Sequence, residues 1–234
     1  MRKSQRSFHS RSAAALLCLA AGAAAAAAAA TAPDSQAWRT TVTQFASGHF
    51  HHPAWGYSHC VRDYELAKSL AEEDHAIIDD DVLFAAAYLH DMAAFAPWDR
   101  EKEGIDHQDE AARIVDTVLA GSGFPMRKID AVRGAIRTHM FDRKPAGAEA
   151  VYLHDADALD WLGAIGAARI LALIDPNGGD PDGPKVMKML SDNLAQVPAG
   201  VVSAAAKRRM PALRDELARF VDALRRETAD LRTL

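Results

Sequence analysis

The stretch VLFAAAYLHD, residues 82–91, joins a run of apolar residues to an imidazole and a carboxylate. Its apolar residues recur at helical spacing, and His90 lies four residues past Ala86, so it falls near the buried side of a helix. Residues Asp79–Asp81 precede the run and suit the N-cap and first turn of that helix. An unpaired buried carboxylate is very costly, so Asp91 needs a partner, and a metal ion is one such partner.

Three other stretches of the chain offer side chains that could complete the shell of such an ion. They are Ser58-His59-Cys60, Thr138-His139-Met140 and His154-Asp155-Ala156-Asp157. With one more histidine added, the candidates in chain order are His59, His90, Asp91, His107, His139 and Asp157. Mixed His and carboxylate ligands projecting from several helices are how helical bundles build catalytic metal sites. Closed structural zinc sites use more Cys than this chain can supply.

The rest of the sequence predicts helices separated by breaks rich in Gly and Pro, and no strand-like alternation stands out. We therefore expect one all-α helical bundle with the metal site between its helices. No GxGxxG, GxxxxGK[ST] or GxSxG motif occurs. The expected helices cover residues 38–45, 57–73, 80–95, 107–120, 125–139, 148–174 (which a break near 162–163 could divide), 185–194 and 213–231.

The composition is that of one ordinary globular domain, with 49% hydrophobic and 25% charged residues among 234. Residues 1–30 hold four of the 27 Lys and Arg and none of the 32 Asp and Glu, so the remainder carries a formal charge of −9. A chain this acidic is a poor candidate for binding nucleic acid through its phosphates. We expect a small-molecule substrate and no nucleic-acid partner, and the sequence leaves the oligomeric state open.

The N-terminus has the pattern of a secretion signal. Four basic residues within the first twelve precede a run rich in alanine, and small residues near Ala30 offer a cleavage site. A retained anchor is the alternative, because the run approaches the ~20 residues that a membrane span needs, but alanine is only weakly hydrophobic. We expect a signal peptide over 1–30, a linker over 31–37 and the helical domain over 38–234. The protein would be exported, to the periplasm in a Gram-negative host, with no membrane span after processing.

The candidate residues also resemble, in their order, the signature of the HD superfamily of metal-dependent phosphohydrolases, which is a His, then His-Asp, then Asp. His59-Cys60-Val61-Arg62 resembles the family's His-x-x-Arg opening, and residues 86–91 resemble its AAxLHD core. Residues 155–166 resemble the DADxLDxxGAxG stretch of its small bacterial members. The resemblance is strong over residues 58–174 and weak over the C-terminal helices, and it implies an HD-type helical bundle.

The resemblance implies that His59, His90, Asp91 and Asp157 bind a divalent ion, which could be Mn, Fe, Co, Ni, Zn or Mg. It implies an enzyme that hydrolyses a nucleotide or another small phosphoester with water activated by the metal. Asp91 would take part in catalysis, and Asp155 and Asp160 would be supporting or capping residues. Nearby cations would hold the anionic oxygens of the substrate. Arg62 is the first candidate for this role, followed by Arg137, Arg143 and Lys144.

Two further histidines, His107 and His139, resemble the extra histidines of binuclear members of the superfamily in their placement. Helices beside the central one could bring both imidazoles to the open side of the first ion, and Asp91 would then bridge two ions. A plainer alternative exists for each residue. His107 could simply be the residue at which its helix starts. His139 could interact as a cation with the C-terminus of the helix that it ends.

One departure from the family pattern opens two competing functions. Many relatives continue the His-Asp pair with a polar residue that is Ala94 here, within Met92-Ala93-Ala94, and the Gly-Tyr-Pro signature of the cyclic-dinucleotide branch is absent. The superfamily also includes hydratases of small nitrile-like molecules such as cyanamide. A small dry pocket lined by Tyr57, Phe95 and Trp98, without Arg or Lys, would favour that activity. A non-catalytic domain that binds a ligand is the third interpretation.

Overall fold

The computed structural model describes residues 36–174 and 182–229. Apart from Ala37, the helices discussed below lie within one compact unit, Trp38–Leu234. The expected secretion signal over residues 1–30 lies outside the described residues, as does most of the expected linker. Among the described helices, none is long and apolar enough to cross a membrane.

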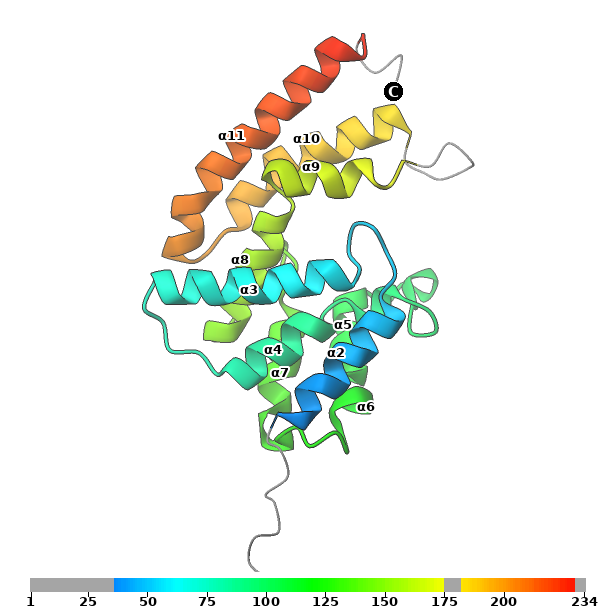
Figure 1. Cartoon of the computed structure of the whole chain (residues 1–234), viewed down its shortest axis with the longest axis vertical. Coiled ribbons are helices and arrows are strands. Elements are labelled where there is room, and N and C mark those ends of the chain that lie inside the picture. The colour runs from blue at the N-terminus through cyan, green and yellow to red at the C-terminus, as the bar shows by residue number, and fades with distance from the viewer. Residues whose placement is uncertain (1–35, 175–181, 230–234) are drawn as a thin grey trace, which may run out of the picture. The chain divides into compact units, whose positions relative to one another are not determined.

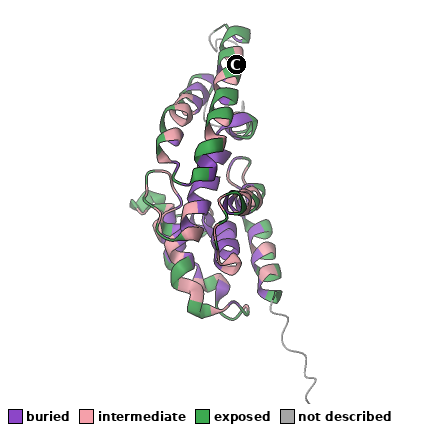
Figure 2. Ribbon diagram, turned by 90° about the vertical axis from the view of Figure 1, so that its left-hand side faces the viewer, coloured by how far each residue is buried: buried purple, intermediate pink, exposed green. Residues whose placement is uncertain are grey.

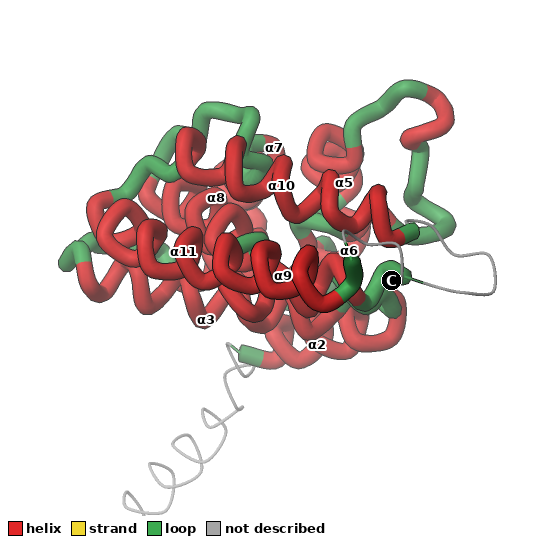
Figure 3. The backbone as a smooth tube through the Cα atoms, turned by 90° about the horizontal axis from the view of Figure 1, so that it is seen from above, coloured by secondary structure: helices red, strands yellow, loops and turns green. Residues whose placement is uncertain are grey.

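The described residues form helices, turns and loops without a strand, which confirms the expected all-α fold for this part of the chain (Figure 3). In chain order the elements are α2 (Ala37–His49), α3 (Tyr57–Glu73), α4 (Asp80–Leu89), η1 (Met92–Ala94), η2 (Glu101–Glu103), α5 (His107–Ile114), α6 (Asp116–Leu119), η3 (Met126–Lys128), α7 (Ile129–Arg137), α8 (Ala148–Asp160), α9 (Gly163–Leu171), α10 (Gly183–Gly200) and α11 (Ala204–Glu227).

The short helix α4 lies inside the bundle, where it packs against α3, α7 and α8 (Figure 1). Every residue from Val82 to Leu89 is buried, as expected of a helix that is apolar all round. Asp79 caps this helix as predicted, since its side chain accepts hydrogen bonds from the backbone N–H groups of Asp81 and Val82. Figure 2 shows buried residues mostly in the middle of the molecule and exposed residues on the outer turns of its helices.

The last three helices, α9, α10 and α11, pack on one another. They contact the helices around α4 through α8 and α3. The predicted break near 162–163 is confirmed, because Trp161 and Leu162 separate α8 from α9. Gly163 has a φ of +62°, a conformation that favours glycine and lets the chain turn between the two helices. The two C-terminal helices are longer than predicted.

The prediction that the central helix continues to residue 95 was wrong. Helix α4 ends at Leu89, and His90 is its C-cap. Asp91 then has φ −96° and ψ 9°, outside helical geometry, and the 3-10 turn η1 follows. Successive side chains on a regular helix point about 100° apart. The change of direction at Asp91 therefore lets two adjacent residues reach one centre.

Other helix boundaries also differ from the prediction. The helix expected over 107–120 is interrupted at Val115, and the one expected over 125–139 begins as η3 and becomes α-helical at Ile129. Hydrophobic periodicity indicates a helical segment well but leaves its ends to the turn chemistry of each terminus.

Candidate metal centre

Three helices direct His and Asp side chains to one buried point. His59 lies in the first turn of α3, the His90-Asp91 pair follows α4, and Asp157 lies in α8. The Nε2 atoms of His59 and His90 are 3.3 Å apart, and Asp157 Oδ1 lies 3.3 Å from His59 Nε2. Asp91 Oδ2 lies 3.3 Å from His90 Nε2 and 3.7 Å from His59 Nε2. The fold thus brings together the four side chains that the sequence singled out, all of them buried.

The spacing and chemistry of these donor atoms fit a divalent ion. Ligand bonds of about 2.0–2.3 Å place neighbouring donors roughly 3–4 Å apart around one ion. The Nδ1–H of His90 donates to the Ala87 carbonyl at 2.8 Å, and the Nδ1–H of His59 donates to Asp160 at 2.8 Å. Each bond orients the ring so that Nε2 faces the shared point. His59 Nε2 also lies 3.4 Å from Arg169 Nη2.

Opposing effects set the protonation of this cluster. Burial lowers the pKa of His90, but the adjacent Asp91 carboxylate outweighs it and raises that pKa to about 9. Burial raises the pKa of Asp91, but the surrounding imidazoles, with His90 first, hold it well below its usual range. In His59 the effect of burial is likewise overcome, chiefly by Asp157, and the pKa is raised. A metal ion at this point would displace the protons that the imidazoles hold in its absence.

Asp160 supports the centre from behind. Its carboxylate accepts hydrogen bonds from His59 Nδ1 at 2.8 Å, from Arg62 Nε and Nη2 at 2.8 Å each, and from Arg169 Nη1 at 2.9 Å. Arg62 therefore faces Asp160 and does not line the cavity described below. The role of Arg62 in this structure is therefore to position the Asp160 carboxylate, and not to bind a substrate in that cavity. Arg169 is buried, and the sequence analysis missed it because nothing local marks its partner nine residues upstream.

His107 and His139 lie on the other side of Asp91. Their Nε2 atoms are 3.3 Å and 3.5 Å from Asp91 Oδ1, and 3.4 Å from each other. The Nδ1–H of His139 donates to the Ile136 carbonyl at 2.7 Å, which turns its Nε2 toward Asp91. Asp91 thus presents Oδ2 to one pair of imidazoles and Oδ1 to the other, as a bridging carboxylate would.

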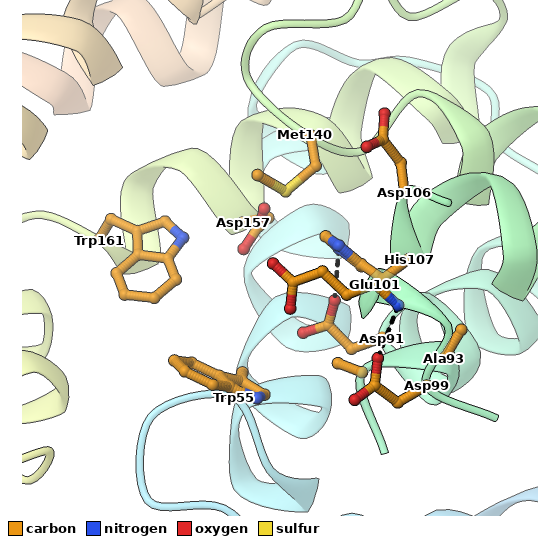
Figure 4. A pocket seen from close by; sticks show the side chains of 11 residues that line it. Trp55, Asp91, Ala93, Asp99, Glu101, Asp106, His107, Met140, Asp157 and Trp161 are labelled. Atoms are coloured by element: carbon orange, nitrogen blue, oxygen red, sulfur yellow. Dashed lines mark hydrogen bonds and ion pairs between the residues drawn. The ribbon is translucent and has the colours of Figure 1, made fainter. Parts of the chain in front are cut away.

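Asp91 and Asp157 line a cavity of about 340 Å³ beside the centre (Figure 4). The cavity is lined by Trp55, Asp91, Ala93, Ala94, Asp99, Glu101, Asp106, His107, Met140, Asp157 and Trp161. No Lys or Arg is among these lining residues, and the predicted substrate contacts of Arg137, Arg143 and Lys144 do not occur in this cavity. Two tryptophans, Trp55 and Trp161, line it, whereas Tyr57, Phe95 and Trp98, the lining that would have favoured a hydratase, do not.

Asp63 also lies at the centre, although the sequence analysis did not single it out. It follows His59 by one turn of α3, and its Oδ2 lies 3.2 Å from His59 Nε2 and 3.7 Å from His90 Nε2. Burial raises the pKa of Asp63 well above its usual range. The i, i+4 spacing of His59 and Asp63 on a predicted helix was the signal that could have found it.

Comparisons with known proteins agree with this site. The family model of the HD domain matches residues 56–162, which contain His59, His90, Asp91 and Asp157. None of the curated proteins is a significant match. The fold and its His and Asp residues define an HD-type helical domain. The chain thus contains an HD domain over residues 56–162.

Solved structures share this fold at low sequence identity. A Lactobacillus plantarum protein superposes with a TM-score of 0.62 at 22% identity, over 82% of this chain and 97% of its own. Bacillus subtilis YpgQ in complex with ADP gives 0.59 at 20% identity, over 82% and 97%. An HD-superfamily hydrolase from Bacillus thuringiensis gives 0.56 at 22% identity, over 82% and 97%.

Proposed function

We propose that this protein is a metal-dependent phosphohydrolase that acts on a nucleotide or another small phosphoester. The observation that carries the proposal is the convergence of His59, His90, Asp91 and Asp157 beside a cavity that Asp91 and Asp157 line. A divalent ion held there would lower the pKa of its water and polarise a phosphoryl oxygen. Its identity among Mn, Fe, Co, Ni, Zn and Mg is left open by His and carboxylate donors.

The charge of the cavity wall constrains how a phosphoester would bind. The lining carries five carboxyl groups and no Lys or Arg, and the outer ones belong to Asp99, Glu101 and Asp106. An anionic substrate would therefore depend on bound cations to offset its charge, because the protein wall itself repels it. This arrangement favours substrates that enter as a metal complex, as nucleotides with Mg²⁺ commonly do.

Two tryptophans favour a substrate with a planar group. The Trp55 ring stacks on His52 with centroids 3.6 Å apart, and the guanidinium of Arg169 lies 3.6 Å from the centroid of the Trp161 ring. Both indoles are thus held in place by a second side chain while they line the cavity. Stacking of a nucleobase on an aromatic ring is worth about 1–3 kcal/mol. The ADP in the YpgQ complex supports a nucleotide as the substrate class.

A hydratase of a small nitrile-like substrate is the second candidate. It is favoured by the absence of Lys and Arg from the lining, since a neutral substrate needs no cationic contact. The metal would then serve water addition to a carbon–nitrogen bond. The size of the cavity, about 340 Å³, is generous for so small a molecule and favours the phosphohydrolase.

A substrate panel separates these activities. Protein loaded with each divalent ion in turn is incubated with nucleoside mono-, di- and triphosphates, with glycerol phosphate and with cyanamide, and phosphate and urea are measured. We expect phosphate release, its loss in Asp157→Asn, and its retention in the control Asp192→Asn, an exposed acid of α10. Replacing Trp161 with Leu should raise the KM for nucleotides more than that for glycerol phosphate. Urea without phosphate would identify the hydratase, and neither product would refute both enzymes.

A further inference from the structure

Asp63 is a buried carboxylate without a hydrogen-bond partner. It is 0% exposed, and neither of its oxygens accepts or donates a hydrogen bond within the described residues. Asp155 is equally buried, yet it accepts backbone N–H groups from Val202 at 2.9 Å and Ser203 at 2.6 Å. A carboxyl group left alone in the interior is costly whether it is charged or neutral, so it marks a missing partner.

The imidazoles of His59 and His90 cannot serve as hydrogen-bond donors to Asp63 and to their other neighbours at the same time. His59 and His90 each use Nδ1 for another acceptor, so in the neutral ring Nε2 carries a lone pair. That lone pair on His59 Nε2, 3.2 Å from Asp63 Oδ2, repels the ionised carboxylate. A proton on His59 Nε2 could serve only one neighbour well, whereas Asp63, Asp157 and His90 all lie within 3.3 Å of that atom.

A single cation would satisfy all of these atoms together. One donor atom from each of His59, Asp63, His90 and Asp157 can be chosen so that all four lie within 4.8 Å of one another. Two neutral imidazoles and two carboxylates match the charge of a divalent ion. Asp91, by contrast, groups with His90 and His139. Asp91 Oδ2 stays 3.3 Å from His90 Nε2, so Asp91 remains at the same centre while its Oδ1 lies toward His107 and His139.

We propose that Asp63 is a protein ligand of the divalent ion at this centre, beside His59, His90 and Asp157. This inference rests on the metal centre of the proposed function and adds a carboxylate that the His, His-Asp, Asp pattern does not contain. It explains why a charged residue occupies an otherwise apolar position of α3, next to the buried Cys60 and Tyr64. An Asp63 that served the fold alone would be expected to have protein hydrogen-bond partners, as Asp155 has.

The test combines metal affinity with the stability of the metal-free protein. Co²⁺ is titrated into the chelator-treated full chain by calorimetry while its visible absorption is recorded. Asp63→Asn should bind Co²⁺ with ~10-fold or weaker affinity and an altered spectrum. Its urea midpoint without metal should stay equal or rise, because a buried unpaired carboxyl has been removed. Asp63→Leu should show the same pattern if the asparagine variant folds poorly.

Asp155→Asn is the matched control, since it replaces an equally buried acid that does have partners. It should lower the urea midpoint and leave the Co²⁺ spectrum unchanged. Wild-type affinity and spectrum in Asp63→Asn would overturn the inference and leave the metal centre standing. A wild-type protein that binds no Co²⁺, Mn²⁺ or Zn²⁺ would instead refute the proposed metal centre itself.

Discussion

Replacing Asp160 with alanine should destabilise the metal-free protein by about 3–5 kcal/mol, which is the cost of breaking a buried ion pair from one side. The variant loses one carboxylate that joins His59, Arg62 and Arg169. The cost arises chiefly at Arg169, whose guanidinium would stay buried with no carboxylate partner. It would keep the Ala54 carbonyl, His59 Nε2 at 3.4 Å and the Trp161 ring as contacts. Arg62 is 32% exposed in its side chain and adds only about 0–1 kcal/mol.

The same change should also weaken metal binding by about 10–100-fold, because His59 loses the acceptor that orients its ring. Unfolding is followed by tryptophan fluorescence in urea with chelator present, since a bound ion would raise the apparent stability by mass action. Asp192→Ala, which removes an exposed pair with Lys188 on α10, should cost about 0.5 kcal/mol or less. A loss below about 1 kcal/mol in Asp160→Ala would refute the reasoning, because Arg169 would then be tolerated without its partner.

Two further predictions concern stability in acid and a second metal ion at His107 and His139. Burial opposes ionisation of Asp81, but Arg39 and Lys128 outweigh it and hold the pKa of this carboxyl group below the ordinary 3.8. The ionised carboxylate therefore stabilises the fold above that pH, and this contribution is lost as the pH falls. The free energy of unfolding should therefore fall more steeply below pH 3.8 in wild type than in Asp81→Asn, and parallel acid titrations would contradict this. In excess Mn²⁺, elemental analysis should find two ions per wild-type chain and one in the His107→Ala/His139→Ala double variant. A wild type that never exceeds one ion, with full activity in the double variant, would exclude the second site.

Local patterns in the sequence were sufficient to predict the helical segments and most residues of the candidate metal centre. Helix α3 begins and ends where the 3.6-residue periodicity places it, at Tyr57 and Glu73. The cap at Asp79 was likewise predictable, because its side chain bonds to N–H groups only two and three residues away. The order His59, His90-Asp91, Asp157 could be found in the same way, since each of these residues lies in a recognisable motif.

The tertiary structure alone decided which side chains share a partner. Arg62 and Asp160 are 98 residues apart in the chain, and Arg169 and Ala54 are 115 apart, so no local pattern could link them. The two tryptophans of the cavity come from a loop and from the end of α8, and the sequence singled out neither of them. Periodicity determines which residues share one face of a helix, but the crossing of α3, α4 and α8 determines what that face meets. For this reason Asp63 could be placed on a buried face from the sequence, whereas its unpaired carboxylate beside two imidazoles emerged only from the packed helices.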